Sequence, residues 1–200
     1  MRRVNFAGFN PRMRYARIIQ AGASDMLRLI DPAAELWGEE SSRLNAGAGG
    51  SAWIVDPIDG AKASACGSKI WGTLLALITG GGLRLGALNR PELHERLIGI
   101  AGKTYWSQDG RDFRVLKTST EARQIRDCIV ATSSYELMDS LERSTFAEFD
   151  YDCYAYVLLV KGQIDAVVDC HLRPHGSAGL VPAAWLAAGA AETSAVPKEL

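Results

Sequence analysis

The order of apolar and polar residues predicts helices near both ends of the chain and strands in its middle. Residues 11–30 place apolar side chains at helical spacing. This helix should end before Pro32, because the residue that precedes a proline avoids the helical conformation. Further helical patterns cover three later segments: 137–146, 154–160 and about 178–190.

Short apolar runs separated by turn residues predict a strand-rich centre. The first run begins at Trp53 and follows a stretch rich in Ser, Ala and Gly, residues 41–51, which predicts a flexible loop. Gly80-Gly81-Gly82 joins two apolar runs with no helix behind it, so it predicts a hairpin turn rather than a phosphate cradle. The later strands are expected at 73–79, 83–88, 96–101, around Tyr105 and Phe113 with a turn at Asp109-Gly110, at 128–132 and at 164–169.

Helices around a strand-rich centre predict layered α and β elements rather than a regular parallel βαβ array. Two hundred residues can bury a sizeable core, and no repeat or internal boundary interrupts the pattern. We therefore expect residues 1–200 to form a single domain.

Composition and charge narrow the classes of function. With 22 basic and 23 acidic side chains the net charge is -1, so we expect neither nucleic acid nor membrane as a partner. The arginines within the first 24 residues are interpreted as a solvated helix face, with a targeting peptide as the alternative. Four cysteines without C-x-x-C spacing favour buried, reduced thiols and a cytoplasmic location.

The most informative stretch is WIVDPIDG, residues 53–60, with Gly38-Glu39-Glu40 a short distance upstream. Pro57 stiffens the turn between Asp56 and Asp59, so the two carboxylates can converge on one hard divalent cation, which prefers oxygen ligands. The alternative is a plain surface turn built from Asp-Pro and Asp-Gly.

GEE followed by WIVDPIDG resembles the first signature of the inositol monophosphatase-like family of magnesium-dependent phosphatases. Later runs resemble its histidinol-phosphatase branch: Trp71-Gly72-Thr73-Leu74, LGALNRP, Tyr105-Trp106, Asp152-Cys153-Tyr154-Ala155-Tyr156 and residues 172–182. The resemblance implies an α/β (α+β) fold, a layered αβαβα sandwich of the inositol monophosphatase type. It also implies a chain shortened at both ends, with an incomplete N-terminal helix region and C-terminal strand.

The same resemblance implies Mg²⁺-dependent hydrolysis of a small phosphate monoester, of the histidinol phosphate or inositol phosphate type, by a metal-activated water. The implied metal ligands are the side chains of Glu39, Asp56 and Asp59 and the carbonyl of Ile58. Glu39 and Asp59 are the implied catalytic residues, and Glu39 would orient or deprotonate the water. The backbone of Gly60 and Ala61 would bind phosphate, and Asp152 and Asp169 would contact the substrate, although solvation at the end of a helix or strand is an equal alternative for both aspartates.

Three positions depart from the family pattern. Ala61 stands where the family has a threonine whose hydroxyl helps to activate the water. Gly176 and Ala16 stand where the family has metal-binding or nearby acids. Two hypotheses therefore stay open: a phosphatase with reduced activity, or an impaired relative that binds a phosphorylated ligand or a protein partner. A homodimer is an alternative to a monomer in either case.

Overall fold

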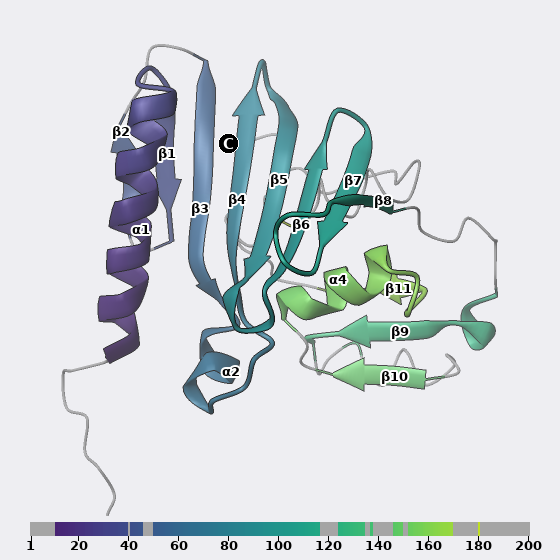
Figure 1. The fold of residues 1–200 in the computed structure, drawn as a ribbon. Helices are drawn as coiled ribbons and strands as arrows, with labels where there is room; N and C mark the ends of the chain where they lie inside the picture. Colours follow the sequence, from purple (N-terminus) through teal and green to yellow (C-terminus); the bar gives the residue numbers. More distant parts are fainter. Residues whose placement is uncertain are drawn as a thin grey trace, which may run out of the picture.

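The computed structural model describes residues 11–39, 41–45, 50–116, 124–134, 137, 146–149, 152–169 and 180. Within these ranges the chain forms an eight-stranded sheet and a three-stranded sheet, with helices packed against them in layers (Figure 1). The layered α/β architecture expected from the sequence is confirmed.

The larger sheet has the spatial order β2-β1-β3-β4-β5-β6-β7-β8, and the smaller sheet has the order β10-β9-β11. Neighbouring strands of the larger sheet are antiparallel except for the parallel pair β1 and β3, and the smaller sheet is parallel. The helices are α1 (Pro11–Ile30), α2 (Ala61–Ala65) and α4 (Cys153–Val160). The strands are β1 (Glu35–Gly38), β2 (Ser41–Asn45), β3 (Ser51–Asp59), β4 (Gly72–Thr79), β5 (Gly82–Arg90), β6 (Glu95–Ile100), β7 (Lys103–Ser107), β8 (Arg114–Leu116), β9 (Ile129–Thr132), β10 (Phe146–Phe149) and β11 (Ala166–Val167).

Three apolar clusters hold the layers together. The first lies between α1 and one face of the larger sheet and includes Leu27, Leu36, Trp53 and Val55. The second lies between the opposite face and α4 and includes Leu74, Leu88, Leu97, Val157 and Val160. The third lies between α4 and the smaller sheet and includes Ala131, Ala155 and Ile164. The helix α4, of sequence CYAYVLLV, is apolar on all sides, which suits a helix buried between two sheets (Figure 1).

Several predicted elements are confirmed. The first helix ends at Ile30, before Pro32, as expected. The hairpin at Gly80-Gly81 is also confirmed: Thr79 pairs with Gly82, and both loop residues have positive φ angles of 60° and 72°. Two positive φ angles are the requirement of a type I′ turn, which two adjacent glycines meet without strain.

Three predictions of local structure are wrong. Residues 41–45, expected as part of a loop, form β2 and pair with β1. Phe146, expected in a helix, lies in β10, where pairing with β9 decides the conformation of a short apolar run. The strand expected at 164–169 is shortened to Ala166–Val167. The helix expected at 178–190 lies outside the described residues except for Leu180.

The cysteines differ from expectation in part. Cys153 is buried, as predicted, whereas Cys66 is exposed and Cys128 partly exposed; all three are free thiols. Cys170 lies outside the described residues. None of the described helices combines the length and apolar character needed to cross a membrane.

Candidate active site

A bulge in β3 brings Asp56 and Asp59 onto the same face of the sheet. Asp56 pairs with Leu74 of β4 and Asp59 pairs with Gly72, so three steps on β3 match two steps on β4. The extra residue falls at Pro57-Ile58, where the proline has no N–H to donate to the ladder. In a regular strand, residues three apart point to opposite faces. The bulge instead turns both carboxylates toward α4.

Two hydrogen bonds fix the bulge. The amide of Ile58 donates to Oδ1 of Asp56 at 3.1 Å, and the hydroxyl of Thr73 donates to the carbonyl of Pro57 at 2.9 Å. Asp56 is only 3% exposed. The WIVDPIDG motif therefore adopts a defined turn at the end of a buried strand and is not the surface turn that the sequence left as an alternative.

Asp59 is held by the first residue of α4. The amide of Cys153 donates to Oδ2 of Asp59 at 2.8 Å. Gly72, opposite Asp59, makes room for this approach, because a Cβ there would lie 2.5 Å from Cδ1 of Leu88 and 3.2 Å from Sγ of Cys153. Sequence reasoning assigned no role to Gly72 or Cys153, although both lie in runs that carried the family resemblance.

Asp152 lies against the turn that leads into α2. Gly60 has a φ of 79°, and a Cβ at this position would lie 3.1 Å from Oδ2 of Asp152. Asp152 itself has φ 44° and ψ -138°, a conformation that side chains rarely adopt. Strained backbone of this kind clusters at ligand sites. The structure thus brings Asp152 beside Gly60 and Ala61, the predicted phosphate-binding residues.

Glu39 completes the acidic group from the neighbouring strand. Its amide donates to the carbonyl of Val55 at 3.2 Å, which continues the pairing of β1 with β3. Burial, and then the charges of Asp59 and Glu39, raise the pKa of Asp56 to about 9. Burial also raises the pKa of Asp59, against the hydrogen bonds from Cys153. Like charges gathered around a buried carboxylate are the electrostatic situation that a divalent cation relieves.

The donor set fits Mg²⁺ in chemistry, since it offers carboxylate oxygens in a confined place. As the side chains lie, however, the described part of the chain holds no group of three or more His, Cys, Asp or Glu residues close enough to share an ion. Glu39 is exposed, and a hydrogen bond between its side chain and Asp56 contributes to the raised pKa of Asp56, so these two carboxyl groups already face each other. The ligand set of Glu39, Asp56, Ile58 and Asp59 therefore stays a prediction.

Asp169 lies on the α4 side of the same site. Its Oδ1 accepts hydrogen bonds of 2.7 Å from both the amide and the hydroxyl of Ser133, and its Oδ2 accepts one of 3.1 Å from the hydroxyl of Tyr156. The charge of Asp169 contributes to the raised pKa of Asp59, after burial and the charge of Glu39. Sequence reasoning found Asp169 but missed Ser133 and Tyr156, which orient it.

The positions that depart from the family pattern have different surroundings. Ala61 is exposed at the start of α2, so its methyl group faces open space where the family has a hydroxyl. Ala16 is buried in α1 at 4% exposure and offers no ligand atom in its side chain. Gly176 lies outside the described residues.

Comparison with curated proteins finds phosphatases. Over 161 residues the chain is 30% identical to the bifunctional phosphatase IMPL2, chloroplastic, of Arabidopsis thaliana, a match that covers 76% of this chain and 45% of the relative. Over 156 residues it is 28% identical to the histidinol-phosphatase of Chlorobaculum parvum, covering 74% of this chain and 58% of the relative. The chain thus spans about half the length of the curated relatives that it matches.

Comparison with solved structures finds the same fold. An inositol monophosphatase from Zymomonas mobilis superposes with a TM-score of 0.77 at 26% identity, covering 92% of this chain and 72% of that one. An IMPase/NADP phosphatase complexed with Mg²⁺ and phosphate superposes with a TM-score of 0.68 at 20% identity, covering 86% and 67%. The model of the inositol monophosphatase family matches residues 17–195. Since this match covers most of the sequence, the chain belongs to the inositol monophosphatase family.

Proposed function

We propose that this protein hydrolyses a small phosphate monoester in an Mg²⁺-dependent reaction. The observation that carries the proposal is the β3 bulge, which turns the carboxylates of buried Asp56 and half-buried Asp59 to one face beside Glu39. The phosphatase relatives support it, as does the Mg²⁺ and phosphate complex of a structure with the same fold.

In this proposal Glu39, Asp56 and Asp59, with the carbonyl of Ile58, hold the cation. Bound Mg²⁺ would neutralise charge on the phosphoryl oxygens and lower the pKa of an attacking water. Glu39, the exposed member of the group, orients that water and accepts its proton. The Cys153 amide occupies one oxygen of Asp59 and thereby fixes the direction of the other.

The phosphate would lie against the backbone of Gly60 and Ala61, directly after Asp59. Asp152 borders this turn. Asp169, which follows β11, lies beside Tyr156 of α4, and Ser133 and Tyr156 orient its carboxylate. Carboxylates accept hydrogen bonds from hydroxyl or ammonium groups. This arrangement suits a leaving group that carries such groups, as inositol phosphate and histidinol phosphate do.

One observation favours a second candidate function. Ala61 presents a methyl group where the family has the hydroxyl that helps to activate water. Loss of one preorganised polar group commonly lowers a rate by about 10²–10³-fold. The rival is a relative that binds a phosphorylated ligand on the same scaffold without turning it over.

Phosphate release from histidinol phosphate and from inositol phosphate, each with and without Mg²⁺, separates the two. We expect turnover only with Mg²⁺, and a loss of about 10²-fold or more in Asp56→Asn. Asp25→Asn is the matched control, because Asp25 is a highly exposed carboxylate on α1. Turnover that is independent of Mg²⁺, or equal in wild type and Asp56→Asn, contradicts the proposal. Binding of ligand without turnover supports the rival.

A further inference from the structure

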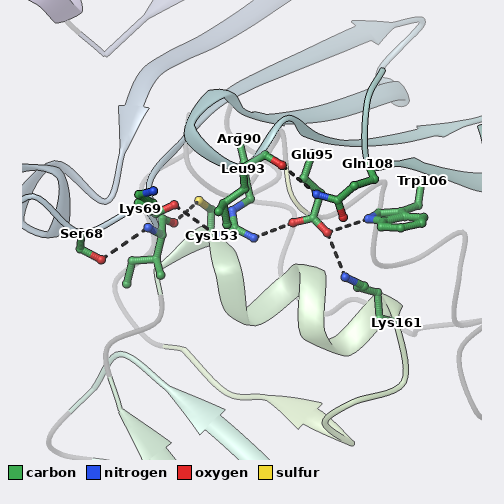
Figure 2. Close-up of polar contacts among 10 residues, drawn as sticks. Ser68, Lys69, Arg90, Leu93, Glu95, Trp106, Gln108, Cys153 and Lys161 are labelled. Carbon is green, nitrogen blue, oxygen red and sulfur yellow. Dashed lines mark hydrogen bonds and ion pairs between the residues drawn. The ribbon is translucent and has the colours of Figure 1, made fainter. Parts of the chain in front are cut away.

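Four side chains form a buried charged cluster between the larger sheet and the C-terminal end of α4: Arg90, Glu95, Trp106 and Lys161 (Figure 2). Glu95 stands at its centre. Its Oε2 accepts from Nη1 of Arg90 at 2.6 Å, while its Oε1 accepts from Nε1 of Trp106 at 2.7 Å and from Nζ of Lys161 at 3.0 Å. We call this group the Glu95 cluster.

Arg90 extends the cluster toward the candidate active site. Its Nη2 donates to the carbonyl of Lys69 at 3.3 Å, and its guanidinium lies 3.8 Å from the centre of the Tyr154 ring. Lys69 belongs to the segment that connects α2 with β4, and Tyr154 is the second residue of α4. One guanidinium therefore contacts both segments that flank the end of β3.

Each residue that Arg90 contacts in this way is next in sequence to Cys153 or to a residue that bonds Cys153. Tyr154 directly follows Cys153, whose amide holds Asp59. Lys69 directly precedes Ile70, whose carbonyl accepts the Cys153 thiol at 3.5 Å. Lys161 of the same cluster caps the other end of α4 and also lies 4.8 Å from the centre of the Trp106 ring. The Glu95 cluster thus fixes α4 at both ends and fixes the segment against which Cys153 packs.

Stability alone does not account for this arrangement. The side chains of Arg90 and Glu95 are 0% and 5% exposed, and removing such charges from water costs about as much as their attraction returns. In addition, Nε of Arg90 is buried without a hydrogen-bond partner among the described residues. What the planar guanidinium provides, and an apolar side chain would not, is a fixed direction toward Glu95, the Lys69 carbonyl and the Tyr154 ring together.

We propose that Arg90 and Glu95 are positioning residues for the reaction: they hold α4 and the Lys69-Ile70 segment so that the Cys153 amide orients Asp59. This inference rests on the proposed function. It predicts that variants of the cluster lower turnover and weaken Mg²⁺ binding without removing any group that touches the substrate.

The test compares Arg90→Met, Arg90→Lys and Glu95→Gln with two controls in the full chain. Arg96→Gln removes an exposed charge at the position after Glu95. The Arg96 side chain donates to Asn89 and does not belong to the Glu95 cluster. Leu27→Ala removes a buried side chain from α1, in the apolar cluster on the opposite face of the sheet, and so provides a destabilised protein with the Glu95 cluster intact. The readouts are kcat and KM at a temperature well below unfolding, the Mg²⁺ concentration for half-maximal activity, and hydrogen exchange of the Cys153 amide.

We expect Arg90→Met and Glu95→Gln to lower kcat by about tenfold or more, since small misplacements of catalytic groups cost up to about 10²-fold. KM for the substrate should change less than kcat, the Mg²⁺ requirement should rise, and the Cys153 amide should exchange faster. Arg90→Lys keeps the positive charge but loses the planar guanidinium that donates in several fixed directions. Its kcat, Mg²⁺ requirement and amide exchange should therefore lie between those of wild type and Arg90→Met. If Arg90→Met does not fold, Arg90→Lys carries the test. Both controls should keep wild-type kcat. Arg96→Gln should also keep wild-type exchange, and Leu27→Ala gives the increase in exchange that lower stability alone produces, which the cluster variants should exceed.

Wild-type kcat and wild-type exchange of the Cys153 amide in a folded Arg90 variant overturn the inference. So does a loss of activity in Leu27→Ala that matches the loss in the cluster variants, because it would then reflect stability alone. If wild type shows no phosphatase activity, the proposed function fails by itself. Hydrogen exchange of the Cys153 amide and Mg²⁺ binding measured by calorimetry still decide the positioning role in that case.

Discussion

The amide of Cys153 donates a 2.8 Å hydrogen bond to Asp59, although the two residues lie 94 positions apart in the sequence. This bond joins the first residue of α4 to the last residue of β3. It fixes one oxygen of a carboxylate at the candidate metal site, so the geometry of that site depends on how closely α4 approaches the sheet.

Gly72 controls that approach. A methyl group at position 72 would lie 2.5 Å from Leu88 and 3.2 Å from the Cys153 sulfur. We expect Gly72→Ala to destabilise the protein by about 1–3 kcal/mol through overpacking and to lower activity further by displacing Cys153 from Asp59. Denaturant unfolding and kcat at matched temperature measure the two effects.

Gly82→Ala is the control for that experiment, because Gly82 is also in the β4–β5 strand pair, but the nearest atom to its added Cβ is 3.9 Å away. It should change stability and activity little. Equal effects of the two substitutions on stability and kcat would show that the close approach of Leu88 and Cys153 to Gly72 does not cause the losses.

The fold could be predicted where a local pattern decides the structure. The first helix, the hairpin at Gly80-Gly81 and the buried strand before Asp56 each follow from periodicity or turn chemistry. The segments 41–45 and 146–149 could not be predicted, because their own sequences do not favour strands. The first becomes a strand by pairing with β1, and the second by pairing with β9.

For the candidate site, the carboxylates could be predicted from the sequence, but the residues that orient them could not. Glu39, Asp56 and Asp59 belong to a recognisable motif. Ser133, which orients Asp169, carries no local signal. Tyr156 and Arg90 lie in runs that resemble the family, but their contacts with Asp169 and Tyr154 arise only when separate strands and α4 meet. The bulge is an intermediate case: Pro57 indicates an interrupted ladder, but the shift in register is visible only against β4.

Ala61→Thr should restore a missing group. Position 61 is exposed at the start of α2, so a hydroxyl can be added without disturbing the core. If that hydroxyl helps to activate water as in the family, kcat should rise, by up to about 10²-fold. Ala61→Val has nearly the same shape as the threonine variant without its hydroxyl and should not raise kcat. Equal rates in the two variants would contradict the assigned role of the position.

The Glu95 cluster makes stability depend on pH. Burial acts to raise the pKa of Glu95, but hydrogen bonds from Trp106 and Lys161 and the nearby charges outweigh it and lower the pKa below its usual 4.5. A lowered pKa in the folded state stabilises the protein above the unfolded value, and this contribution is lost as pH falls through the folded value. Wild type should therefore exceed Glu95→Gln in unfolding free energy above about pH 4.5, and the difference should shrink in stronger acid.

Unfolding by urea at a series of pH values measures this difference. Glu92→Gln changes an exposed carboxylate three residues earlier and should leave the pH dependence in place. A constant difference between wild type and Glu95→Gln at every pH would contradict the account of Glu95.

Calorimetric titration of Mg²⁺ into wild type, Asp56→Asn, Asp59→Asn and Asp25→Asn tests the central claim most directly, because it examines the cation site apart from turnover. Our account predicts saturable binding by wild type and by Asp25→Asn, and binding that is lost or severely weakened in Asp56→Asn and Asp59→Asn. Absence of Mg²⁺ binding in wild type, or equal binding in all four proteins, would contradict it.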